Sequence, residues 1–171
     1  FSFIVPKDIS YSFGEGKVTY YAEDGQIDGN GFSTDFIIGG SDSSAVLDDL
    51  GPTISLYMND ESFVFGGITN SNPVLVAKLN DEQGINTVGN GIGHDIVAIL
   101  DANTENAIIL NDYYEADLDD YQSGKVNYPF SSLSEGKHTI TLKAWDVANN
   151  SSERTIEFTV VEESEIKIEN L

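Results

Sequence analysis

Short runs of alternating apolar and polar residues are the feature that most limits what this chain can fold into. In Lys137–Trp145, the residues Ile140, Leu142 and Ala144 fall on one face of an extended strand, and Arg154–Val161 repeats the pattern. Side chains alternate between the two faces of a strand, so a period of two predicts half-buried β-strands. The two runs are close in sequence and therefore predict an antiparallel hairpin with a shared core.

The alternation recurs along the chain at spacings of about 10 to 15 residues, with turn-forming residues between the runs. Further strands are expected at 53–58, 62–65, 73–79, 95–100, 107–110 and 125–130. No segment shows a convincing 3.6-residue apolar period. The pattern predicts an all-β fold, an immunoglobulin-like antiparallel β-sandwich.

A second group of strands is expected before the sandwich. They lie at 1–5, 17–22 and 35–40. Three short strands bury too little apolar surface to form a stable domain by themselves. We therefore expect residues 1–45 to be the C-terminal strands of an upstream β domain, the sandwich to span 46–161, and the acidic segment 162–171 to be a linker to a following domain.

Charge and composition exclude several functions. The chain has 29 acidic and 8 basic residues, a net charge of -21. A protein needs clustered Lys and Arg to bind a nucleic acid or an anionic membrane, so neither is an expected partner of this chain. No apolar run approaches the roughly 18 residues of a membrane helix, so direct membrane insertion is not expected. The charge suits a soluble, repelling surface or one that collects cations.

The sequence contains no cysteine. This removes disulfides, cysteine nucleophiles and thiolate metal sites. No Gly-x-Ser-x-Gly nucleophile motif is present either. We therefore expect no catalytic residue in this chain, and an independent hydrolase is the weakest interpretation.

A glycine-rich loop leads into the expected strand at 95–100. It contains Gly84, Gly89, Gly91 and Gly93, of which one or more should have positive φ. His94 and Asp95 follow, but neighbouring strand residues point to opposite faces and cannot easily act as a base and its orienting carboxylate. We expect a structural role, with His94 tied to nearby backbone. The expected structural residues are Gly91, Gly93, His94, Asp95, Asp101, Trp145, Asp146 and Asn150.

Two acidic loops offer the oxygen ligands that calcium prefers. The candidate ligands are Asp24, Asp28 and Asn30 in the first loop and Asp117, Asp119 and Asp120 in the second. Neither loop has the spacing of an EF-hand. The simpler interpretation is turn chemistry in the first loop and a solvated acidic surface in the second. No cofactor is expected, and calcium is the ion that these residues would bind.

Several long motifs resemble a known family. They are Gly-Ile-Gly-His-Asp-Ile (91–96), Leu-Asp (100–101), Leu-Asn-Asp-Tyr-Tyr-Glu-Ala-Asp-Leu-Asp-Asp-Tyr (110–121), Leu-x-Glu-Gly-x-His-x-Ile-x-Leu-Lys-Ala-Trp-Asp-Val (133–147) and Asn-Asn-Ser-Ser (149–152), with N-terminal motifs at 3–9, 16–22 and 36–40. Together they resemble the C-terminal, non-catalytic region of type IX secretion system sortases, which belong to the gingipain-like cysteine peptidases.

The resemblance implies a non-catalytic accessory or interaction domain, because the family's catalytic His and Cys lie in an upstream domain. The parent enzyme would remove C-terminal sorting signals from secreted cargo at the cell surface, on the exterior of the outer membrane of a Gram-negative bacterium. Implied partners are other domains of the parent protein, outer-membrane secretion components and secreted cargo. The alternative is a carbohydrate- or lipopolysaccharide-binding module that uses calcium, because the chain has eight Tyr and one Trp.

Overall fold

The computed structural model describes residues 4–5, 7, 12–39, 47–88 and 93–162. The chain divides into two compact units. The hairpin unit is Ile9–Leu47, and the sandwich unit is Phe1–Asp8 together with Asp48–Leu171. The division was expected after residue 45, and in the structure it falls after residue 47. No helix among the described residues is long and apolar enough to cross a membrane.

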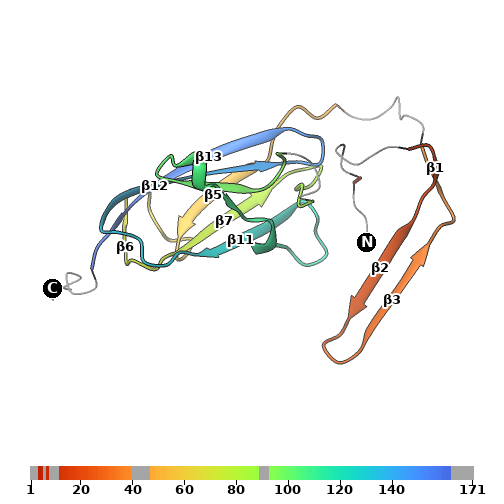
Figure 1. The fold of residues 1–171 in the computed structure, drawn as a ribbon, viewed down its shortest axis with the longest axis horizontal. Coiled ribbons are helices and arrows are strands. Elements are labelled where there is room, and N and C mark those ends of the chain that lie inside the picture. The colour runs from red at the N-terminus through yellow and green to blue at the C-terminus, as the bar shows by residue number, and fades with distance from the viewer. Residues whose placement is uncertain (1–3, 6, 8–11, 40–46, 89–92, 163–171) are drawn as a thin grey trace. The chain divides into compact units, whose positions relative to one another are not determined.

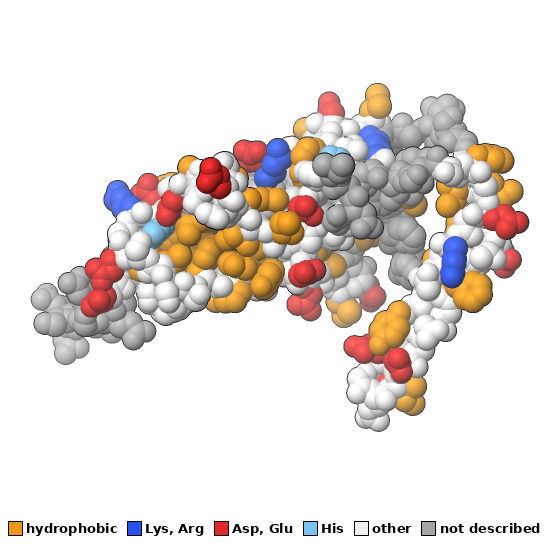
Figure 2. Space-filling view, in the orientation of Figure 1, with side chains coloured by type: hydrophobic (Ala, Val, Ile, Leu, Met, Phe, Trp, Pro, Cys, Tyr) orange, Lys and Arg blue, Asp and Glu red, His pale blue; other side chains and the backbone are white. Residues whose placement is uncertain are grey.

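The hairpin unit contains two short antiparallel ladders. β1 (Gly14–Glu15) pairs with β4 (Ile37–Ile38), and β2 (Val18–Glu23) pairs with β3 (Asp28–Ser33). Hydrophobic side chains are visible on the surface of the β2–β3 hairpin in Figure 2, and Tyr21 is 65% exposed. Residues 1–3 of the strand expected at 1–5 lie outside the described part, and Ile4 and Val5 are not in a strand.

The sandwich unit consists of two packed sheets (Figure 1). The first sheet has the order β10 (Tyr114–Ala116), β11 (Ser123–Pro129), β7 (Val74–Asn80), β5 (Thr53–Met58). The second has the order β6 (Ile68–Thr69), β13 (Ser151–Val160), β12 (Gly136–Trp145), β8 (Val97–Leu100), β9 (Ile108–Ile109). Pairing is antiparallel except between β6 and β13. The predicted all-β sandwich is confirmed. Two 3₁₀ turns, η1 (Thr104–Asn106) and η2 (Asn111–Tyr113), interrupt the strands.

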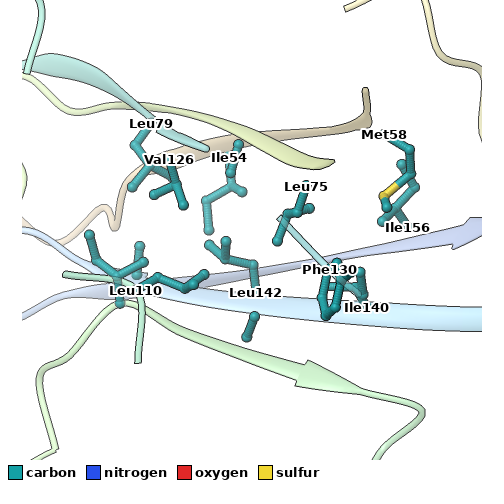
Figure 3. Close-up of a cluster of buried hydrophobic side chains, with 14 of the residues drawn as sticks. Ile54, Met58, Leu75, Leu79, Leu110, Val126, Phe130, Ile140, Leu142 and Ile156 are labelled. Carbon is teal, nitrogen blue, oxygen red and sulfur yellow. The ribbon is translucent and has the colours of Figure 1, made fainter. Parts of the chain in front are cut away.

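Apolar side chains of the two sheets meet between them and form the core (Figure 3). The predicted hairpin is β12–β13, in which Ile140 pairs with Ile156. Ile140, Leu142, Ile156 and Phe158 all belong to one buried cluster, as predicted. Side chains alternate between the two faces of a strand, so these four side chains point inward and are buried.

The prediction of a strand at 62–65 is wrong, because these residues form a turn and irregular structure. The Ser62 amide donates to the Asp60 carboxylate at 2.8 Å, and this local bond closes a turn in place of a strand ladder. Gly66 then adopts a φ of +79°. The chain pairs only afterwards, where Ile68 lies opposite Thr159 in the parallel β6–β13 pair.

Candidate metal centre

Three aspartates that are far apart in the sequence meet in the sandwich unit. Asp81 directly follows β7, Asp146 directly follows β12, and Asp48 precedes β5. One carboxylate oxygen of each residue lies within 4.8 Å of those of the other two. Across the described ranges, no other group of three His, Cys, Asp or Glu residues converges in this way. We call these three residues the aspartate cluster.

Strand pairing explains why the segments meet. β5 and β7 are antiparallel, and Thr53 lies opposite Asn80, so the start of β5 and the end of β7 are neighbours. The second sheet joins them through a bridge between Ile85 and Asp146. The Asn86 amide also donates to the Trp145 carbonyl at 2.9 Å. The cluster therefore rests on the ends of core strands in both sheets.

Asp48 is held against the turn that follows β12. The Asn150 side-chain amide donates to the Asp48 carbonyl at 3.1 Å, and the Leu50 amide donates to Asp48 Oδ1 at 3.2 Å. Gly51 permits this approach, because a Cβ there would lie 2.5 Å from the backbone carbon of Ser151. Asp48 was not among the site residues expected from the sequence.

Asp146 and Asn150, both expected to be structural residues, close the turn that follows β12. The Asn150 amide donates to Asp146 Oδ1, and the Asn150 side chain donates to Asp146 Oδ2, both at 2.8 Å. Asn149 adopts a φ of +70°, which Asn tolerates better than most residues. These bonds orient the fully buried Asp146 carboxylate.

The aspartate cluster concentrates negative charge in a poorly solvated place. Burial raises the pKa of Asp81, and the Asp146 and Asp48 carboxylates raise it further, against hydrogen bonds from the Gln83 and Gly84 amides. Burial likewise raises the pKa of Asp146, together with the charge of Asp48 and against the bonds from Asn150. Two unit charges about 4 Å apart repel by about 4 kcal/mol at an effective dielectric of 20. Among the described residues, no Lys, Arg or His forms an ion pair with the cluster.

The calcium candidates of the first acidic loop lie in the hairpin unit. Asp24 Oδ1 accepts from the amides of Gln26 and Ile27 at 2.9 and 2.8 Å, so this carboxylate closes its own turn. Those bonds lower the pKa of Asp24. Asp28 and Asn30 lie within β3. The structure thus gives Asp24 the turn role that the simpler interpretation assigns.

The candidates of the second acidic loop surround a serine. Ser123 Oγ lies 2.5 Å from Asp117 Oδ2 and 2.8 Å from Asp120 Oδ2. The Gln122 amide donates to Asp120 Oδ1 at 2.8 Å, and this bond and the serine lower the pKa of Asp120. Asp119 occupies the left-handed region with a φ of +57°. These contacts form a closed turn before β11.

The glycine-rich loop is partly outside the described residues, which exclude Gly89 and Gly91. Gly84 and Gly93 have φ values of +110° and +84°, as predicted. His94 is half-buried and packs on Trp145, with 4.3 Å between ring centroids. Asp95 is also half-buried. His94 therefore contacts the strand that leads to the aspartate cluster without belonging to the cluster.

Asp101 pairs with the second histidine of the chain. Asp101 Oδ2 lies 2.7 Å from His138 Nδ1, and the Ser134 carbonyl lies 2.8 Å from His138 Nε2. A carbonyl and a carboxylate both accept hydrogen bonds, so this geometry favours the protonated imidazole, in which both ring nitrogens donate. Asp101 Oδ1 also accepts from the Thr139 amide at 2.9 Å. This arrangement is structural, and it occupies both nitrogens that a general base would need.

Comparison with known proteins identifies a similar solved structure. No family model matches the chain, and no curated protein matches it. The crystal structure of dimeric latent PorU from Porphyromonas gingivalis matches with a TM-score of 0.66 and 33% sequence identity. The match covers 95% of this chain and 15% of the PorU chain. The chain is thus similar to a PorU segment over nearly its whole length, and it spans a small part of that longer protein.

Proposed function

We propose that this chain is a non-catalytic accessory domain of a cell-surface type IX secretion sortase. The observation that carries the proposal is the match to PorU, which covers 95% of the chain with both fold and sequence in agreement. The residues support the same assignment. The chain has no cysteine to act as a nucleophile, and both ring nitrogens of His138 bond to structural acceptors.

In this role the domain acts through its surfaces. Its partners are other domains of the parent protein, secretion components of the outer membrane, or secreted cargo, and it works on the outer face of the cell. A net charge of -21 favours a partner surface rich in Lys and Arg.

Calcium-dependent binding of a carbohydrate or lipopolysaccharide ranks second. A calcium ion that bridges to a sugar needs open coordination positions on the protein surface. The aspartate cluster is the best ion-binding candidate among the described residues, but Asp81 is 8% exposed and Asp146 is fully buried. An ion held there would be enclosed by protein, which favours a structural ion over a sugar-bridging one.

The proposal is tested with the purified chain and with the longer protein. We expect the purified chain to leave a sorting-signal peptide uncleaved. We expect the longer protein without residues 48–161 to cleave a short peptide but to fail in processing folded cargo. Cleavage by the purified chain that is lost in His94→Ala would refute the proposal. Normal cargo processing without the domain would also refute it.

A further inference from the structure

We propose that Asp48, Asp81 and Asp146 bind one calcium ion that fixes the end of the sandwich unit where the chain connects to the hairpin unit. The cluster brings three carboxylates together, and no described basic side chain pairs with any of them. A cation is the ligand whose charge balances such a group. This inference does not depend on the proposed sortase function.

Unpartnered buried oxygens point to the same ligand independently of the charge. Asp48 Oδ2 is buried and has no hydrogen-bond partner. Asp81 is 8% exposed, and its Oδ1 accepts from the amides of Gln83 and Gly84. In the turn after Asp146, Asn149 Oδ1 is also buried without a partner. Buried oxygens without donors are costly for the fold unless a ligand satisfies them.

The spacing of the oxygens suits calcium. Calcium binds oxygen at about 2.3–2.6 Å, so two ligands on opposite sides of one ion lie about 5 Å apart. The cluster oxygens all lie within 4.8 Å of one another, which is inside that span. Magnesium demands near-ideal octahedral geometry at about 2.0–2.1 Å. The three aspartates come from two strand ends and a loop, and such an irregular set favours the more tolerant calcium.

The ion would act on both connections to the hairpin unit. Before that unit, the Lys7 amide donates to the Val147 carbonyl at 2.9 Å. After it, Asp48 is the first residue of the returning chain, and its carbonyl accepts from Asn150. Both attachment points are thus bonded to the turn that carries Asp146. Calcium at the cluster would hold this turn, the end of β7 and the returning chain together.

Calcium binding is tested on the purified chain after removal of metals with EDTA. We expect isothermal titration calorimetry to show one saturable calcium site, with magnesium bound more weakly. Terbium is a luminescent substitute for calcium, and Trp145, the single tryptophan, directly precedes Asp146 and should sensitise its emission. Absence of saturable calcium binding would overturn the proposal.

A matched pair of variants locates the site. Asp48→Ala removes a cluster carboxylate, and Asp49→Ala removes the same charge from the exposed neighbour. We expect Asp48→Ala to weaken calcium binding by about tenfold or more and Asp49→Ala to leave it unchanged. In EDTA, Asp48→Ala should not lower Tm, because it removes repulsion and an unsatisfied oxygen. Equal weakening in both variants would indicate diffuse charge attraction and refute the site.

Hydrogen exchange tests the effect on the junction. The amides of Gln83, Gly84 and Asn150 donate to cluster carboxylates. We expect calcium to slow their exchange, and we expect amides in the middle of the β12–β13 pair to be unaffected. If calcium binds but these three amides exchange at the same rate, the ion does not fix this end of the sandwich, and that part of the proposal fails.

Discussion

At the scale of single residues, His138 shows how a buried polar group can be fully satisfied. Its side chain is 8% exposed, stacks on Phe158 and bonds to Asp101 and Ser134. Burial, the largest single effect, lowers the pKa of His138, but the Ser134 carbonyl and the Asp101 carboxylate together outweigh it, so the net change in the pKa is upward. When it is protonated, the ring can donate to both acceptors and link β12 to the loop after β8.

This link makes stability depend on pH. Because the pKa of His138 is higher in the folded chain than its ordinary value of 6.5, its contribution is complete below that value and is lost as pH rises through the folded pKa. We expect Tm to fall with rising pH across that window. Asp101→Asn, which keeps the shape but removes the charge, should flatten the profile. Calorimetry measures Tm against pH for the original chain and for Asp101→Asn. Parallel Tm profiles for the two proteins would contradict this explanation.

Gly124 is a residue for which a side chain has no space. A Cβ at this position would lie 2.5 Å from the Glu115 carbonyl oxygen and from the Tyr114 ring. We expect Gly124→Ala to destabilise the sandwich by about 1–3 kcal/mol, as overpacking does. Gly31→Ala is the control, because a Cβ there meets nothing within 4 Å. Urea denaturation measures both, and equal stability of the two variants would show that β10 can move aside.

At the scale of strands, long alternating runs could be predicted from the sequence and short strands could not. β12 and β13 each have ten residues, and their shared inward face follows directly from the pattern. β6 has two residues and pairs in parallel with the distant β13, so no local pattern marks it. The sequence around Ser62 is apolar enough to suggest a strand, but the Asp60 side chain bonds the local backbone instead.

The aspartate cluster was missed for a related reason. Asp146 was identified from its turn, but Asp48 and Asp81 join it only through the register of β5, β7 and β12. A usable signal was present, because Asp81 and Asp146 each directly follow a strand that points its side chains into the core. The two acidic loops were given as calcium candidates because they are rich in carboxylates. Their oxygens, however, bond to local turns.

Phe158 tests how much the core contributes to the stability of the β12–β13 hairpin. Phe158 is fully buried between the sheets. We expect Phe158→Ala to cost about 3–5 kcal/mol of unfolding free energy, because it leaves a cavity among side chains of both sheets. Chemical denaturation gives the value. A loss below about 1 kcal/mol would mean that the core collapses around the cavity or that Phe158 is less enclosed than the structure indicates.

At the scale of the whole molecule, the two units differ in how much they bury. Among the described residues, every member of the hydrophobic core belongs to the sandwich unit, between Ile54 and Val160. In the hairpin unit, by contrast, Tyr20, Tyr21 and Phe32 are all exposed. The stability of the sandwich should therefore not require the hairpin unit.

Replacement of residues 9–47 by a flexible Gly-Ser linker tests this independence. We expect the shortened chain to keep the Tm of the sandwich within about 4 °C, the shift that a loss of roughly 1 kcal/mol would cause. A larger drop would show that the hairpin unit contributes to the fold of the sandwich. Hydrogen exchange on the intact chain should show the β2–β3 amides exchanging much faster than those of β12–β13.

The position of Asp48 also determines how the sandwich would carry tension. The chain enters beside the first residues of β13, where Asp48 bonds to Asn150 and Gly51 packs against Ser151. Val160, the last residue of β13, lies at the opposite end of the same strand. A pull between these two points runs along β13, so its ladder with β12 is loaded in shear and its hydrogen bonds resist together. We therefore expect the sandwich to resist such a pull through all ten residue pairs of β12 and β13, which would have to slip together.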